Sequence, residues 1–165
     1  MKRTIEVLNE LEKEGVFLRY AIGGGIGAIF YTEPFLTFDL DVFIVLPATD
    51  GGLVTLTPVY DALRVRGYGE ENECVVIEGI SVQFLPAYNP LTEEALAQAR
   101  ETDYEGVPTR VLKAEYLIAI CLQTGRSKDR ARVAMLREQA ELDRDLLADL
   151  LKRRHLEEKW MLWTE

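Results

Sequence analysis

A run of glycines between an apolar strand and a pair of acids constrains this chain more than any other sequence feature. Residues 16–22 are rich in β-branched and aromatic side chains and predict a buried strand, and Gly23, Gly24 and Gly25 follow it directly. Glycine after a strand lets the backbone turn sharply and approach a ligand without a Cβ in the way. The apolar residues 26–31 then predict a short helix that begins at the glycines. The free N–H groups at the start of such a helix suit a phosphate group.

Two acids lie on the next predicted strand, residues 38–46. Asp39 and Asp41 share one face because side chains alternate along a strand. Adjacent carboxylates repel each other unless a cation lies between them, and Mg²⁺ shared with nucleotide phosphates is the natural choice. The pattern therefore predicts a metal-binding, catalytic pair beside a phosphate site at Gly24 and Gly25. A plain tight turn and a hydrated strand end would have the same pattern.

Composition excludes several classes of protein. The chain has 165 residues, 48% of them hydrophobic, which is enough for one core and excludes a disordered chain. No apolar run approaches the ~20 residues that cross a bilayer, and no apolar signal region follows Met1. Cys74 and Cys121 lie far apart in apolar runs, so we expect buried free thiols and a cytoplasmic protein. The single histidine, His155, argues against a His-rich zinc site and a Ser-His-Asp triad.

Charge is unevenly distributed. The net charge of -9 argues against a protein that coats nucleic acid, so a nucleic-acid partner is not expected. The stretch from Arg110 to Arg137 nevertheless holds seven basic and two acidic residues. This basic stretch is either an anion-binding face or a solvated helix surface.

The remaining pattern predicts an α/β core over residues 1–112 and a helical segment over residues 113–165. In the core, Glu73–Glu78 and Ile80–Leu85 are expected to form a tight hairpin or a bulged continuation around Gly79. The other predicted elements are helices at 2–14, 56–65, 91–100, 113–123, 127–140, 143–153 and 155–162, and a strand at 104–112.

The glycine pair and Asp39-x-Asp41 resemble the signature of the nucleotidyltransferase superfamily, whose fold is that of DNA polymerase β. Glu33-Pro34 and Thr37, with the segment from Thr124 to Asp129, are similar to bacterial nucleotidyltransferase-like proteins related to abortive-infection toxins of toxin–antitoxin systems. The resemblance implies an α+β fold, in which a mixed sheet carries helices on one side and a C-terminal helical segment packs on this core.

The resemblance also implies a function. The chain would bind a nucleoside triphosphate with Mg²⁺ and transfer a nucleoside monophosphate to a hydroxyl of a protein, an RNA or a small molecule. Asp39 and Asp41 would hold the metal, and Thr37 would support their strand. Arg126 and Lys128 would contact the phosphates, although Lys128 also suits a plain surface position.

The chain departs from the family pattern at several positions. The neighbouring strand usually carries a third acid, and here the position holds Gln83. The toxin-type relatives carry an arginine where this chain has Phe35, a lysine where it has Cys121, and an acid where it has Arg132. These departures leave an alternative function, a catalytically degenerate relative that binds a nucleotide or a partner protein in a toxin–antitoxin type system.

Two tryptophans mark the C-terminal end. Trp160 and Trp163 are three residues apart and therefore lie on one face of a helix. They are expected to pack this helix onto the core. The alternative is a surface for a homodimer or for an antitoxin, since aromatic residues dominate such interfaces.

Overall fold

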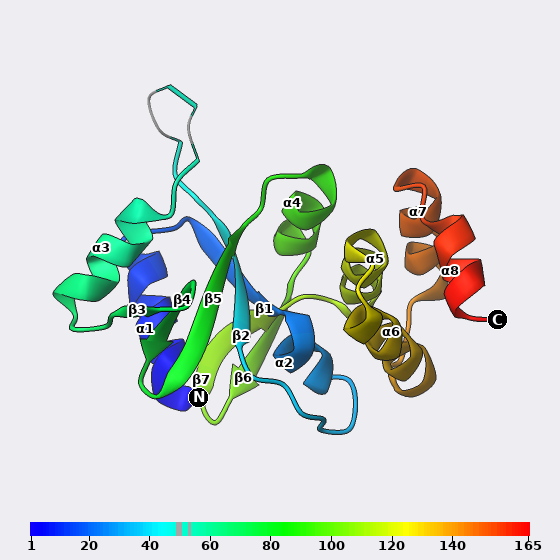
Figure 1. The fold of residues 1–165 in the computed structure, drawn as a ribbon, viewed down its shortest axis with the longest axis horizontal. Helices are drawn as coiled ribbons and strands as arrows, with labels where there is room; N and C mark the ends of the chain where they lie inside the picture. Colours follow the sequence, from blue (N-terminus) through cyan, green and yellow to red (C-terminus); the bar gives the residue numbers. More distant parts are fainter. Residues whose placement is uncertain (49–50, 53) are drawn as a thin grey trace.

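The computed structural model describes residues 1–48, 51–52 and 54–165. These residues form a mixed sheet of seven strands in the order β3-β4-β5-β2-β1-β7-β6 (Figure 1). At its centre, β2 is parallel to β5 and antiparallel to β1, and β1 is parallel to β7. The strands are β1 (Arg19–Gly23), β2 (Leu40–Val45), β3 (Glu70–Glu71), β4 (Cys74–Ile77), β5 (Ile80–Pro86), β6 (Arg100–Tyr104) and β7 (Val107–Val111).

Helices cover the sheet and extend beyond it. Figure 1 shows α1 and α3 on one side, α2 and α4 on the other, and α5 to α8 as a C-terminal helical segment. The α+β class, the mixed sheet and the C-terminal helices are confirmed, and the sheet carries helices on its second face in addition to the expected one. The helices are α1 (Lys2–Lys13), α2 (Gly24–Ile29), α3 (Thr57–Val65), α4 (Pro90–Ala97), α5 (Ala114–Thr124), α6 (Ser127–Gln139), α7 (Arg144–Arg153) and α8 (Glu157–Trp163).

Alternation along β2 decides which face carries the acids. Leu40, Val42 and Ile44 are fully buried in the hydrophobic cluster that α1 and α3 share with the sheet. Phe43 belongs instead to the cluster on the opposite face, together with residues of α2, α4 and α5. Asp41 has the same parity as Phe43, so its carboxylate faces the C-terminal helices.

The second half of the sheet differs from the sequence prediction. The helix expected over 91–100 ends at Ala97. The strand expected over 104–112 corresponds to β7, and β6 before it was not predicted. They pair antiparallel around Glu105 and Gly106, which both have positive φ. The sequence of β6 is polar and charged, so only its pairing with β7 identifies it as a strand.

The tight hairpin expected around Gly79 is present. β4 and β5 pair antiparallel, with Ile77 opposite Ile80, and the turn residues Glu78 and Gly79 have φ of 51° and 83°. The Glu78 carboxylate accepts a hydrogen bond of 2.6 Å from the Tyr68 hydroxyl. Glu78 therefore lies at a turn, and it does not share the face of Asp41.

The C-terminal helices pack on the core, and both cysteines are buried. Trp160 and Trp163 are partly buried against the same hydrophobic cluster as Phe43, which supports a packing role. Burial raises the pKa of the Cys121 thiol to about 12, so this thiol is inert near neutral pH. Within the described residues, the helices are too short or too polar to span a membrane.

A network of charges ties α7 to α4. Glu94 accepts hydrogen bonds of 2.8 and 2.9 Å from the Arg153 guanidinium and one of 3.2 Å from Arg154. The Tyr116 hydroxyl of α5 donates a further bond of 2.7 Å to it. The bonds from Arg153, ahead of the one from Tyr116, hold the pKa of Glu94 at about 2.

We expect Glu94→Gln to lower the free energy of unfolding at pH 7 by about 1–2 kcal/mol, since it removes charge-assisted bonds that are partly screened by solvent. The folded-state pKa of about 2 lies below the ordinary 4.5, so this stabilisation is present above pH 4.5 and is lost as the pH falls towards 2. Urea denaturation from pH 7 to pH 2 measures it. Glu93→Gln, at the exposed neighbouring residue, is the control. The prediction is wrong if the difference in unfolding free energy between Glu94→Gln and the parent does not shrink as the pH falls.

Candidate functional site

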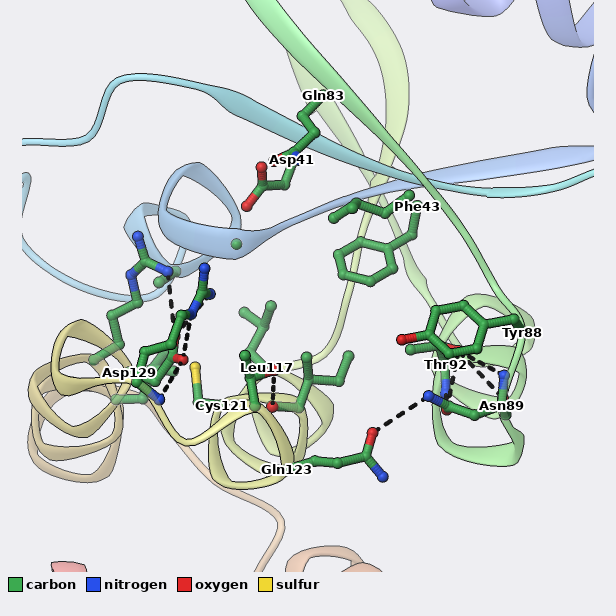
Figure 2. Close-up of a pocket in the computed structure, with 18 of the residues that line it drawn as sticks. Asp41, Phe43, Gln83, Tyr88, Asn89, Thr92, Leu117, Cys121, Gln123 and Asp129 are labelled. Atoms are coloured by element: carbon green, nitrogen blue, oxygen red, sulfur yellow. Dashed lines mark hydrogen bonds and ion pairs between the residues drawn. The ribbon is translucent and has the colours of Figure 1, made fainter. Parts of the chain in front are cut away.

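The centre of the site is formed by three neighbouring strands. Asp41 on β2 lies opposite Gly23 on β1 and opposite Gln83 on β5. Paired residues of parallel strands project from the same face, so the Gln83 amide lies beside the Asp41 carboxylate, as Figure 2 shows. The structure thus places Gln83 at the expected third position of the acidic site.

The glycines give room to these side chains. Gly24 has a φ of +59°, and a Cβ at this position would overlap the Asp41 carboxylate. A Cβ at Gly25 would lie 2.6 Å from the Thr37 hydroxyl and 2.9 Å from Arg132 Nη2. A side chain at either glycine would therefore displace a neighbouring side chain of the site, and Thr37 lies against the glycine turn.

Asp39 lies one residue before β2 and faces the same space as Asp41. The two carboxylates line one compartment of about 490 Å³, together with Thr37, Gln83 and Lys128. Its apolar lining consists of Phe35, Leu36, Phe38, Ala131 and Met135. We call this space the outer compartment.

A second space, the inner compartment, adjoins the first and has a volume of about 230 Å³. Figure 2 shows Asp41 and Phe43 on one side of it, Leu117 and Cys121 of α5 on the opposite side, and Tyr88 and Asn89 at one end. The residues that line both compartments are Asp41, Gln83, Arg126 and Arg132. The two spaces therefore meet at the carboxylate and the cations.

The cations lie at the start of α6 and in its first turns, and a buried acid pairs with two of them. Asp129 is only 1% exposed. It accepts bonds of 2.8 and 3.1 Å from the Arg126 guanidinium and one of 3.1 Å from the Arg126 backbone N–H. It also forms an ion pair of 3.6 Å with Arg132. Asp129 therefore both caps the helix and holds the arginines, whereas Lys128 is exposed at the rim of the outer compartment.

Asp41 experiences opposing influences. Burial raises its pKa, whereas Arg132, then Arg126 and more weakly Lys128 lower it, and Asp39 raises it. The net direction is upward. A cation between the two carboxylates would favour the ionised form and remove this penalty.

The donor set fits a hard divalent cation. Asp39 and Asp41 offer carboxylate oxygens and Gln83 an amide oxygen, the ligand types that Mg²⁺ prefers. Among the described residues, no group of three or more His, Cys, Asp or Glu side chains is arranged to hold a metal. The residues therefore suit an ion that takes some of its ligands from a substrate phosphate.

Comparisons of the sequence give no match, neither to a protein-family model nor to a curated protein. Comparison of the structure does. An antigenic nucleotidyltransferase-like protein from Paracoccidioides brasiliensis is similar with a TM-score of 0.58 and 13% identity, over 81% of this chain and 72% of that one. The structure of ANT(2'')-Ia in complex with adenylyl-2''-tobramycin has a TM-score of 0.54 and 15% identity, over 94% and 98% of the two chains. A solution structure of ANT(2'')-Ia, described as an antibiotic-resistance factor, gives 0.51 and 14%, over 96% and 93%.

This chain has the nucleotidyltransferase fold. At these identities the similarity establishes the fold and leaves the reaction open. Because the similarity to both ANT(2'')-Ia structures covers more than nine tenths of this chain, it includes most of the C-terminal helices as well as the sheet.

Within this nucleotidyltransferase fold, the predicted site residues come together. Those that line one or both compartments are Gly24, Thr37, Asp39, Asp41, Arg126 and Lys128. Gly25 lies against Thr37 and Arg132, which line the outer compartment. No site role was predicted for Arg132 or for Phe43, Tyr88 and Asn89 of the inner compartment. For Arg132 a signal existed, since it lies three residues after Asp129 on a helix and therefore on the same face. For the inner compartment no local pattern was available.

Proposed function

We propose that the cleft binds a nucleoside triphosphate with Mg²⁺ and transfers the nucleoside monophosphate to a hydroxyl acceptor. The observation that carries the proposal is the position of Asp39 and Asp41 on one wall of a compartment that also holds cationic side chains and adjoins a glycine turn. Carboxylates that hold a divalent ion, next to cations that hold phosphates, are what phosphoryl chemistry requires.

Each predicted residue has a distinct role in this proposal. Asp39 and Asp41 hold Mg²⁺, which when bound stabilises negative charge on the phosphate oxygens. Gly24 and Gly25 let phosphates approach the backbone, and Thr37 supports the glycine turn. Arg126, oriented by Asp129, and Lys128 neutralise the phosphates.

The proposed transfer is a substitution at phosphorus. The acceptor oxygen forms a bond to the α-phosphorus, and the bond from that phosphorus to the oxygen bridging the β-phosphate breaks. Pyrophosphate leaves with the electron pair of that bond. The hydroxyl proton passes to water, because the neutral amide of Gln83 is too weak a base to take it.

One of the structural neighbours supports the class of reaction. The ANT(2'')-Ia complex contains adenylyl-2''-tobramycin, an adenylyl group joined to an acceptor molecule. A comparable product is proposed for this chain, with an acceptor that its own compartments select.

Gln83 favours one alternative function, a catalytically degenerate relative that binds a nucleotide or a partner protein. The amide opposite Asp41 carries no charge and cannot act as a base. Such a relative would act through a partner protein, as in a toxin–antitoxin pair. The partly buried Trp160 and Trp163 of the C-terminal helices would provide its protein or homodimer contact.

Thermal melting with each of the four nucleoside triphosphates, with and without Mg²⁺, tests the metal–nucleotide site. A ligand present at 100 times its dissociation constant stabilises a protein by about 2.7 kcal/mol, which is a readily measured shift. We expect stabilisation by at least one triphosphate only when Mg²⁺ is present, and its loss on addition of a chelator. Equal melting under all conditions would contradict the proposal and favour a partner-binding protein.

A further inference from the structure

Arg132 brings into the cleft a positive charge that the proposed function does not use. Its side chain is only 13% exposed, and it lines both compartments. Nη1 lies 3.6 Å from the buried Asp129 carboxylate. Nη2 points to the other side, where it would lie 2.9 Å from a Cβ at Gly25. The guanidinium therefore spans from its anchoring acid to the glycine turn.

The strand residues of the site carry less negative charge than a site for two metal ions needs. Gln83 lies opposite Asp41 in the β2–β5 ladder, and a carboxylate in its place would extend the acidic pair to three. An amide oxygen can ligate an ion but does not neutralise it. Asp39 and Asp41 therefore have the charge to balance one divalent ion.

Together, these two features supply the net charge that a second ion with its carboxylate would bring. Two-metal sites use the second ion to stabilise the leaving oxygens, and a second divalent ion with a third carboxylate adds about one net positive charge. A neutral Gln83 with a protonated Arg132 adds the same net charge. Arginine is always protonated near neutral pH and binds phosphate oxygens through two parallel N–H donors.

We propose that Arg132 replaces a second divalent cation, so that the site holds one Mg²⁺ and the guanidinium binds the β- and γ-phosphate oxygens that leave as pyrophosphate. This inference rests on the proposed function. The low exposure of Arg132 and its ion pair with the buried Asp129 hold the guanidinium in the cleft before the triphosphate binds, which lowers the entropic cost of binding.

The test counts bound metal ions as well as measuring affinity. The probes are Mn²⁺, followed by electron paramagnetic resonance, and the α,β-methylene analogue of the triphosphate that stabilises the parent most. We expect one Mn²⁺ per chain in the parent. Arg132→Gln should weaken analogue binding by about 10- to 100-fold, and Arg132→Lys should recover part of the loss. The double variant Gln83→Asp/Arg132→Gln should bind two Mn²⁺ ions.

Arg130→Gln is the matched control, because Arg130 lies on the same helix and lines neither compartment. Melting without ligand verifies that each variant is folded. Two Mn²⁺ ions in the parent, or an Arg132→Gln affinity within twofold of the parent, would overturn the inference and leave the proposed function standing. A parent that no triphosphate stabilises would remove both.

Discussion

Replacing Asp39 and Asp41 together by asparagine should abolish both Mg²⁺-dependent triphosphate binding and nucleotide transfer. The two side chains keep their size but lose the charges that bind the ion, and transfer should fall by a factor on the order of 10³ or more. Incubation of the protein with each labelled triphosphate and a cell extract measures transfer. Label transfer that is absent in the parent, or unchanged in the double variant, would contradict the proposed reaction.

The same variant should not unfold more easily without ligand. Burial raises the pKa of Asp41 in the folded protein, so the ionised carboxylate is a cost to folding that grows as the pH rises above the ordinary value of 3.8. Asparagine removes this cost at pH 7. A melting temperature equal to or above that of the parent, together with lost Mg²⁺-dependent stabilisation, would separate a role in binding from a role in folding.

Gly24→Ala is expected to have the second large effect, on both stability and binding. The φ of +59° is unfavourable for alanine, and the added Cβ would overlap the Asp41 carboxylate. Backbone strain of this kind costs about 1–3 kcal/mol, and displacement of Asp41 should eliminate the stabilisation by triphosphate with Mg²⁺. Chemical denaturation measures the first effect and ligand-dependent melting the second.

Gly69→Ala provides the control for this substitution. A Cβ at Gly69 would meet nothing within 4 Å, and Gly69 does not have the positive φ of Gly24. Its stability should change by no more than about 0.5 kcal/mol, with triphosphate binding intact. If Gly24→Ala changes stability and triphosphate binding as little as Gly69→Ala does, the site does not require a glycine at position 24.

Several parts of the site could be predicted because they depend on local geometry. The period of two along a strand placed Asp39 and Asp41 on one face and placed Gln83 at the third position, where the β2–β5 register has it. Most helices were also predictable, since α1 and α7 carry apolar stripes and begin or end at recognisable residues. Thus Asp143 caps α7 through a bond of 3.1 Å to the N–H of Leu146, as its position suggested.

Other parts were not predictable because their partners are distant in sequence. β6 has a polar sequence, Arg-Glu-Thr-Asp-Tyr, and becomes a strand only through its ladder with β7. Arg132 looked like a departure from a family pattern. The structure directs it into the cleft, where it forms an ion pair with the buried Asp129 one turn earlier on α6.

The sequence by itself determined the local chemistry of this protein: glycines that turn the backbone, and acids that alternation places on one face. These follow from φ preferences and from strand geometry, which act between residues close together in the chain. Only the tertiary structure decided that α6 approaches the strand tips, that Arg132 lies against Gly25, and that two compartments meet at Asp41. Those contacts depend on how the helices pack on the sheet around a shared hydrophobic core. Packing between distant segments has no local signature in the sequence.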